Sequence, residues 1–240
     1  MNETVQQWRH RAAHYGVTWL STRPALYYGI RRALRQTDGL CVSRSTELVI
    51  EGFPRSANST TVYGFIALQD RPVAVAHHKH HAAQVLRAVR WGIPVVVLVR
   101  EPADTVVSLL ALAEEGRVRT GRTGRGNALS LSDVAWAWLC FYEAVLPMRT
   151  KVVVARFADV TRDLAGMIAE VNMRYGTTFR TGPLLRTEES TDLGWHALPN
   201  EVRLAIKNDL WDRLKKESRR GRLHDVLIRC NDVYQKLTAS

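Results

Sequence analysis

Cysteines, long apolar runs and a secretion signal are scarce or missing in this chain, and each absence excludes a class of protein. Only 3 of the 240 residues are cysteine, and none belongs to a Cys-x-x-Cys pair. This usage argues against a zinc ribbon or a disulfide framework and fits a reducing compartment. The longest apolar runs, such as Ile93–Val99, fall far short of the ~20 residues of a membrane-spanning helix. The polar start, Met1–Arg11, lacks a signal pattern. We therefore expect a cytoplasmic protein, with peripheral membrane contact left open.

Acidic residues are also few. The 23 Asp and Glu residues stand against 34 Lys and Arg, which gives a net charge of +11. A basic protein attracts polyanions: nucleic acid, an anionic membrane face, a phosphorylated or sulfated substrate, or a charged cofactor. The segment Gly116–Gly126, which we predict to be a mobile basic loop, interleaves its arginines with glycine and contains no aromatic residue on which bases could stack. We therefore expect no nucleic-acid partner.

Strand-like segments alternate with helical patterns from residue 47 onward. The alternation predicts right-handed β-α-β crossovers and a single three-layer α/β domain, residues 1–240, with a central parallel sheet. Pro94–Val99 is β-branched and apolar on both faces, so we place it at the centre of the sheet. The other predicted strands are Glu47–Glu51, Val73–Ala76 and Lys151–Ala155, and the helices between and after them are Thr60–Leu68, His81–Arg90, Ala103–Ala113, Asp133–Leu146 (capped by Ser132), Thr161–Tyr175 and Asn200–Lys216.

Residues 1–45 read as a helical extension packed on this domain. Two short helices are predicted there, Thr4–His14 and Pro24–Gln36. The second carries apolar residues at helical spacing beside Arg31, Arg32 and Arg35. It is interpreted as a docked amphipathic helix with a solvated basic face, or alternatively as a membrane-surface or acceptor-binding helix.

The loop Gly52–Thr60 follows the first predicted strand and opens a helix. Such a loop is a phosphate cradle, because its amides and the helix dipole point at the anion. In the nucleotide-triphosphatase version, a second glycine and a lysine would stand where this chain has Ala57 and Asn58, and the cation is instead Arg55. The central strand ends in Arg100, where a magnesium-binding Asp would be needed. The sequence therefore predicts an anion pocket without magnesium.

Three segments carry a specific resemblance. Pro54–Thr60 (Pro-Arg-Ser-Ala-Asn-Ser-Thr) resembles the 5′-phosphosulfate loop of the sulfotransferase family that uses 3′-phosphoadenosine 5′-phosphosulfate (PAPS). Val99–Asp104, followed by Ser108, resembles the family's 3′-phosphate motif. Val154–Val160 is similar to its later Arg-Tyr-Glu-Asp-Leu strand end. All three occur in family order within Leu48–Tyr175.

The resemblance implies a P-loop-like sulfotransferase fold, PAPS as co-substrate, no metal, and transfer of a sulfuryl group to a hydroxyl (or amine) of a glycan, glycolipid or small metabolite. Arg55 would stabilise the leaving oxygen. Ala57 and Ala158 replace the family's usual Gly and Glu, and Arg219–Arg222 is a poor copy of a late Arg-Lys-Gly loop, so the small-phenol-acting branch is not favoured. The implied nucleotide-binding residues are Arg55, Ser56, Ala57, Asn58, Ser59 and Thr60 at the 5′ end, Arg100 and Ser108 at the 3′-phosphate, and Phe157 near the adenine.

A histidine cluster, His77–His81, follows the second predicted strand. The family's Lys-Thr-His at this point maps onto His78–His80, which makes His80 the predicted general base and His78 the second choice. Strand alternation would place both on one face, with Lys79 on the other. Glu51 and Asp104 remain carboxylate alternatives. Zinc is disfavoured, since the cluster has no helical i,i+4 pair and no close Cys or acidic partner; an ordinary surface cluster stays open.

Other interpretations stay open. A nucleotide-dependent phosphotransferase on the same fold is the runner-up function, although Asn58 and Arg100 argue against it. A catalytically inactive relative of the family is a further alternative. Trp136, Trp138 and Tyr142 are predicted core aromatics on one helix, whereas Trp195 and His196 are guessed to line an acceptor pocket.

Overall fold

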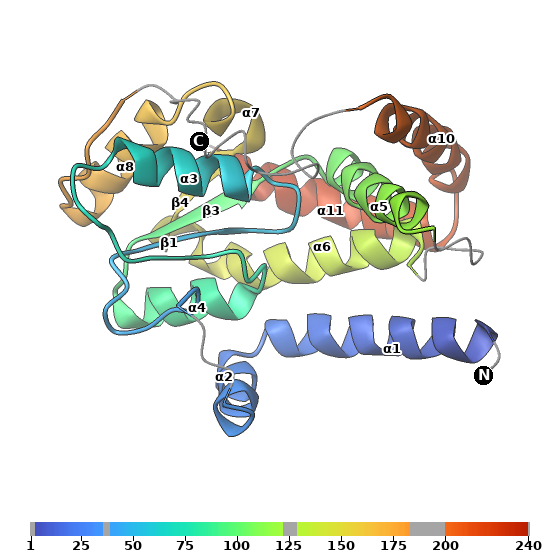
Figure 1. Ribbon diagram of the computed structural model, residues 1–240, viewed down its shortest axis with the longest axis horizontal. Helices are drawn as coiled ribbons and strands as arrows, with labels where there is room; N and C mark the ends of the chain where they lie inside the picture. Colours follow the sequence, from blue (N-terminus) through green and yellow to red (C-terminus); the bar gives the residue numbers. More distant parts are fainter. Residues whose placement is uncertain (1–2, 36–38, 122–128, 183–199, 240) are drawn as a thin grey trace.

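A four-stranded parallel sheet forms the centre of the computed structural model, which describes residues 3–35, 39–121, 129–182 and 200–239 (Figure 1). The strands are β1 (Leu48–Gly52), β2 (Val75–His77), β3 (Val95–Val99) and β4 (Val153–Arg156), in the order β2-β1-β3-β4. All three pairings are parallel. The predicted α/β architecture with a central parallel sheet is therefore confirmed.

The β3 strand lies between β1 and β4, as its sequence predicts. All five of its residues are fully buried, because each face of the sheet is covered by helices. The register pairs Gly52 of β1 with Leu98 of β3, and Val99 of β3 with Arg156 of β4. The carboxyl ends of these strands consequently lie side by side at one edge of the sheet, where ligands bind in open parallel sheets.

Two helical layers cover the sheet. One face packs against α3 (Asn58–Leu68) and α8 (Ala165–Tyr175), through a core that includes Val62, Phe65 and Ile168. The other face packs against a larger core to which five helices contribute. These helices are α4 (Ala82–Trp91), α5 (Pro102–Arg119), α6 (Leu131–Val145), α10 (Glu201–Glu217) and α11 (Arg222–Thr238).

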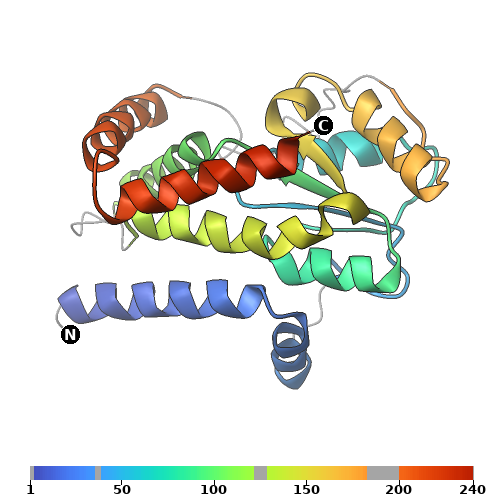
Figure 2. The ribbon, with the colours of Figure 1, turned by 180° about the vertical axis from the view of Figure 1, so that it is seen from behind.

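The short elements complete the chain. A 3-10 turn, η1 (Leu146–Lys151), leads into β4, and the one-turn helix α7 (Phe157–Val160) follows it. At the amino end, α1 (Glu3–Ser21) lies along α6, and α2 (Pro24–Ala33) packs beside α4 at the edge of the molecule (Figure 2). No helix in the described ranges is both long and apolar enough to cross a bilayer.

Several predicted boundaries are wrong, each for a local reason. Ser130, not Ser132, caps α6: its hydroxyl accepts the Asp133 amide (3.2 Å), and the Asp133 carboxylate accepts the Ser130 amide (2.9 Å). This reciprocal pair is a capping box. Helix α1 continues seven residues past His14 to Ser21. Helix α5 runs to Arg119, so the first residues of the predicted loop Gly116–Gly126 are helical, and residues 122–126 lie outside the described residues.

The aromatic residues predicted for the core are mostly there. Trp138 and Tyr142 are completely buried on α6, and Trp136 is partly buried, with its ring 4.5 Å from the ring of Tyr15 on α1. The stretch that contains Trp195 and His196 lies outside the described residues.

Candidate functional site: a polycationic pocket at the sheet edge

The loop between β1 and α3 turns sharply because the two neighbouring strand ends approach each other closely. Gly52 has no side chain, and a Cβ at that position would collide with the carbonyl oxygen of Leu98. Arg55 (φ 73°) and Ala57 (φ 70°) both adopt the left-handed conformation. Glycine enters this region without steric cost, whereas a side chain strains it. The position where the resembled family has glycine is therefore a real site of backbone strain in this chain.

The hydroxyl of Tyr142 links this loop to the end of β3 by hydrogen bonds. It donates to the carbonyl oxygen of Leu98 (2.6 Å), accepts from the amide of Phe53 (3.2 Å) and lies 3.3 Å from the hydroxyl of Ser56. The Ser56 side chain is completely buried by this contact, and it does not line the pocket in front of the loop. Among the predicted binding residues, the Ser56 side chain therefore packs inside the protein against Tyr142 and does not face the cavity.

The amino end of α3 faces the pocket. The first intrahelical bond runs from the Thr61 amide to the Ala57 carbonyl (3.0 Å), so the amides of Asn58, Ser59 and Thr60 precede the helical ladder. The Asn58 side chain donates to the carbonyl of Phe53 (3.1 Å) and so tightens the loop, in the place where a triphosphate site would extend a lysine. Together these amides form an anion-binding helix terminus.

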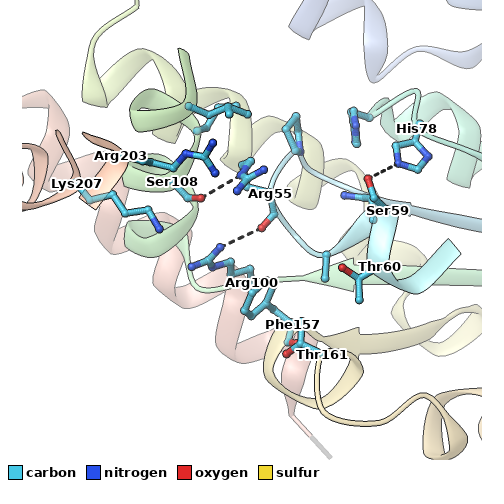
Figure 3. A pocket seen from close by; sticks show the side chains of 16 residues that line it. Arg55, Ser59, Thr60, His78, Arg100, Ser108, Phe157, Thr161, Arg203 and Lys207 are labelled. Atoms are coloured by element: carbon cyan, nitrogen blue, oxygen red, sulfur yellow. Dashed lines mark hydrogen bonds between the residues drawn. The ribbon is translucent and has the colours of Figure 1, made fainter. Parts of the chain in front are cut away.

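Four basic side chains converge on this terminus. Arg55, Arg100, Arg203 and Lys207 line a cavity of about 510 Å³, together with Ser59, Thr60, Ser108 and Phe157 (Figure 3). The Arg55 guanidinium donates to the hydroxyl of Ser108 (3.1 Å), and Arg100 donates to the carbonyl of Arg55 (3.3 Å). The structure therefore brings together the two motifs that the sequence placed 45 residues apart.

The pKa values show how strongly these cations are crowded. Burial lowers the pKa of Arg55, and the charges of Arg203 and Arg100 lower it further. Burial likewise lowers the pKa of Lys207, with added repulsion from Arg100, Arg55 and Arg203. The nearby Asp104 approaches Arg100 at 3.9 Å and remains half-exposed. A polyanion in the cavity would relieve this repulsion, because opposite charges favour the protonated forms.

Arg203 and Lys207 were missed from the sequence. They lie four residues apart on α10, far along the chain from the loop, and their spacing puts both on one helix face. Arg203 is buried in an ion pair with Glu115 of α5, and the Asn200 side chain also donates to Glu115 (2.7 Å). The buried carboxylate thus holds α10 against α5. An i,i+4 pair of basic residues was the only sequence signal for this arrangement.

One wall of the cavity is aromatic. The Arg100 guanidinium lies 4.1 Å from the centre of the Phe157 ring, at the start of α7, and Thr161 lies nearby in the cavity wall. This contact is a cation–π interaction. Phe157 thus lines the cavity beside Arg100, and its predicted place near the adenine stays a prediction.

His80 and His78 also line the cavity, but the reason given from strand alternation is wrong. Strand β2 ends at His77, and both residues adopt positive φ (His78 56°, His80 55°) in the following loop. The completely buried carboxylate of Glu51 shapes this loop: it accepts the amides of Lys79 (2.8 Å) and His80 (3.0 Å). Burial raises the pKa of Glu51 to about 7.

The His80 ring has a defined tautomer. Its Nδ1 lies 2.9 Å from the carbonyl oxygen of Gly52, which can only accept a hydrogen bond, so Nδ1 carries the proton. The Nε2 atom is then the ring nitrogen that can take up a proton. Burial lowers the pKa of His80 below its usual value, which keeps the ring neutral near pH 7. His80 thus has the protonation state of a general base.

The ring of His78 makes different contacts from that of His80. Its Nε2 shares a hydrogen bond with the hydroxyl of Ser59 (2.9 Å), and its ring contacts that of His77. Burial, followed by repulsion from His77 and His80, lowers its pKa to about 4. Of the two carboxylates considered as alternatives, Glu51 is held behind the loop, and neither it nor Asp104 lines the cavity. Among the residues that the structure describes, no group of three His, Cys, Asp or Glu side chains is arranged to hold a metal ion.

A second cavity, of about 310 Å³, adjoins the first. The two share Pro54, His80 and Leu109 in their walls. The second cavity is otherwise bounded mainly by apolar side chains of α1, α5 and α6, among them Val17, Leu110 and Phe141. His80 therefore stands at the junction of a cationic cavity and an apolar one.

The fold and the pocket define an α/β protein with a pocket lined by four basic side chains at the carboxyl edge of a parallel sheet. No protein-family model and no curated protein sequence matches the chain. Its function is therefore inferred from the site itself.

Proposed function

We propose that this protein is a sulfotransferase that moves a sulfuryl group from PAPS to a hydroxyl (or amine) acceptor. The observation that supports this most is the convergence of four basic side chains, Arg55, Arg100, Arg203 and Lys207, on the amino terminus of α3. Such a site suits a ligand with more than one phosphate-like group.

The positions of these groups suggest one orientation of the donor in the cavity. The amides of Asn58, Ser59 and Thr60 suit the 5′-phosphate, with Arg55 at the oxygen that bridges phosphorus and sulfur. The 3′-phosphate would then meet Arg100 and Ser108. Lys207 and Arg203 supply further cations to the cavity. The segment Arg219–Arg222, the poor copy of the family's late basic loop, does not line it. Phe157, whose ring lies against Arg100, would be the aromatic side chain near the adenine.

The reaction is an in-line displacement at sulfur. The acceptor oxygen forms a bond to sulfur while the bond from sulfur to the bridging oxygen breaks. The acceptor proton passes to Nε2 of His80, and adenosine 3′,5′-bisphosphate leaves with the new negative charge on its 5′-phosphate. Arg55 stabilises that developing charge, and an oriented cation there lowers the barrier.

The acceptor would approach through the second cavity, which reaches His80 from the side of α1. Its walls are mainly apolar, so they favour an acceptor that carries an apolar part, as a glycolipid does. A hydroxyl at the junction of the two cavities would lie beside His80. The acceptor's apolar part would lie against side chains such as Val17 and Leu110.

Calorimetric titration with adenosine 3′,5′-bisphosphate in the presence of EDTA tests the proposal. We expect binding without magnesium, and Arg100→Ala should weaken it by roughly 30- to 150-fold, the value of a charge-assisted contact of about 2–3 kcal/mol. The matched control, Arg219→Ala, removes an exposed arginine outside the cavity and should leave the affinity unchanged. A preference for magnesium–ATP would instead support the phosphotransferase.

The role of His80 has its own readout. His80→Gln should reduce turnover of PAPS by about 10²- to 10⁴-fold, the usual contribution of a general base, while the affinity for adenosine 3′,5′-bisphosphate stays within twofold. His78→Gln is the comparison, since Nε2 of His78 is bonded to Ser59. Equal losses of turnover in both variants would contradict the assignment of His80 as the base.

A further inference from the structure

The amino-terminal helices carry an unusual concentration of exposed apolar side chains. Among the described residues, twelve large hydrophobic side chains are exposed, and five of them lie between Val17 and Leu34. Leu26 (49% exposed), Ile30 (46%) and Leu34 (61%) are spaced four residues apart along α2 and its carboxyl end, so they form one stripe on its surface. We refer to these three residues as the apolar stripe.

The stripe is not the face by which α2 packs on the protein. That face is made by Tyr27, the only fully buried residue of α2, and by Tyr28, whose hydroxyl donates to Gln84 of α4 (2.6 Å). Arg87 of α4 stacks on the Tyr28 ring at 3.7 Å. The tyrosines therefore fix the orientation of α2, and the apolar stripe is left exposed. Helix α2 itself lies at the edge of the molecule (Figures 1 and 2).

Basic residues predominate in the amino-terminal segment that carries the stripe. No Asp or Glu occurs between Glu3 and Asp38, whereas six arginines do: Arg9, Arg11, Arg23, Arg31, Arg32 and Arg35. Arg32 and Arg35 are exposed, and Arg23 stacks on the exposed ring of Trp19 at 3.7 Å, at the corner between α1 and α2. Apolar residues with arginines and a tryptophan beside them are typical of a helix that lies in a membrane interface.

We propose that α2, with the adjoining end of α1, docks this protein on an anionic lipid surface. The apolar stripe enters the interface beside Trp19, and the arginines face the lipid phosphates. A neutral protein partner would supply no negative charge to the exposed Arg32 and Arg35, and a second copy of the same basic helix would repel the first. Charge complementarity thus favours an anionic bilayer.

The proposed docking surface adjoins the apolar cavity at His80. Val17 is half-exposed beside Trp19 on α1, and it also lines the apolar cavity at His80. A lipid surface held against this end of α1 would therefore lie next to that cavity. Docking itself is independent of the proposed sulfotransferase function, because it rests on α1 and α2 alone.

Co-sedimentation of the full chain with lipid vesicles tests the proposal. The vesicles are phosphatidylcholine alone, or phosphatidylcholine partly replaced by phosphatidylglycerol. We expect tight binding only to the second kind, at low salt. Ile30→Ser with Leu34→Ser should weaken that binding about tenfold or more, since two aliphatic side chains no longer leave water. The matched control, Leu204→Ser with Ile228→Ser, removes two apolar side chains of similar exposure on α10 and α11 and should bind as the wild type does.

The charges are tested in the same way. Arg32→Gln with Arg35→Gln should weaken binding to the anionic vesicles by about 25-fold at low salt, at roughly fivefold for each arginine near the surface. Arg219→Gln with Arg220→Gln, which removes two exposed arginines in the turn between α10 and α11, should have little effect. Equal losses in the two pairs would show general attraction by the net charge and would overturn the proposal.

Two further results would also overturn it. One is the absence of binding to anionic vesicles by folded wild-type protein. The other is a dimer, detected by analytical ultracentrifugation, that Ile30→Ser with Leu34→Ser converts to a monomer, because a second copy would then be the occupant of the stripe. Binding of adenosine 3′,5′-bisphosphate should be the same in all these variants, which separates the docking from the nucleotide site.

Discussion

Replacing Lys207 with glutamine should affect stability and ligand binding in opposite directions. In the ligand-free protein, the Lys207 ammonium faces Arg100, Arg55 and Arg203, and its pKa is lowered by burial and by these charges. Glutamine removes the charge and keeps most of the side-chain volume. The alternative target, Arg203, is a poorer choice because its loss would also remove the buried ion pair with Glu115, which would keep Arg119 and Asn200 as partners, and would so weaken the packing of α10 on α5.

The expected magnitude follows from Coulomb's law. At an effective dielectric constant of about 20, two unit charges about 10 Å apart repel by roughly 1.7 kcal/mol, and salt at about 0.1 M reduces this nearly threefold. Three cationic neighbours, discounted for the partial exposure of Lys207 and for the opposing attraction of Asp104, give a gain of up to about 1 kcal/mol in the free energy of unfolding. In the complex the same charge attracts a phosphate, so its loss should raise the dissociation constant about tenfold, which is about 1.4 kcal/mol.

Urea denaturation at low salt measures the first effect, and calorimetric titration with adenosine 3′,5′-bisphosphate measures the second. Lys216→Gln, which removes an exposed lysine of the same helix, is the matched control and should change neither quantity by much. Two results would refute this reasoning: a Lys207→Gln protein that is less stable than the wild type, or one that binds the bisphosphate equally well. Either would show that repulsion among the cavity's cations does not destabilise the protein in the absence of an anion, or that Lys207 does not bind one.

Three other substitutions test the loops around the cavity. The folded-state pKa of Glu51 is raised to about 7, so the stability this group contributes is fully present below about pH 4.5 and is lost as pH rises through 7. The free energy of unfolding of Glu51→Gln, measured by denaturant titration relative to that of the wild type, should therefore rise by up to about 3 kcal/mol between pH 4.5 and pH 7.5. A difference between the two proteins that does not change with pH would contradict the raised pKa. Ala57→Gly relieves the left-handed strain and should stabilise the protein by up to about 1 kcal/mol, whereas the same change at Ala205 in α10 should destabilise it by about that amount. Gly52→Ala drives a Cβ into Leu98, and a loss of stability below about 1 kcal/mol would show that β1 and β3 can separate.

The sheet could be predicted because its signals are local. Pro94–Val99 is apolar on both faces, and a segment of that kind is stable as a strand only between two helical layers. The loop Gly52–Thr60 could also be predicted, because a strand followed by small and polar residues and a helix start has few other conformations. The ends of elements were less certain: Ser130 and Ser132 are equivalent as local caps, and only the Asp133 partner distinguishes them.

The rest of the site depends on contacts between distant segments. Arg203 and Lys207 reach the cavity because Glu115 anchors α10 to α5, and nothing in either helix alone shows that pairing. The positive φ of His80 arises because a carboxylate of the neighbouring strand, Glu51, binds the loop amides. Tyr142 was assigned to the core from its pattern, and its hydroxyl under the loop became visible only in three dimensions.

A crystal structure with adenosine 3′,5′-bisphosphate tests the proposed site most directly. We expect the 5′-phosphate within hydrogen-bond distance of the amides of Asn58, Ser59 and Thr60, and the 3′-phosphate on Arg100 and Ser108, with no metal ion between them. A nucleotide bound elsewhere, or held in this cavity only as a magnesium triphosphate, would contradict the assignment.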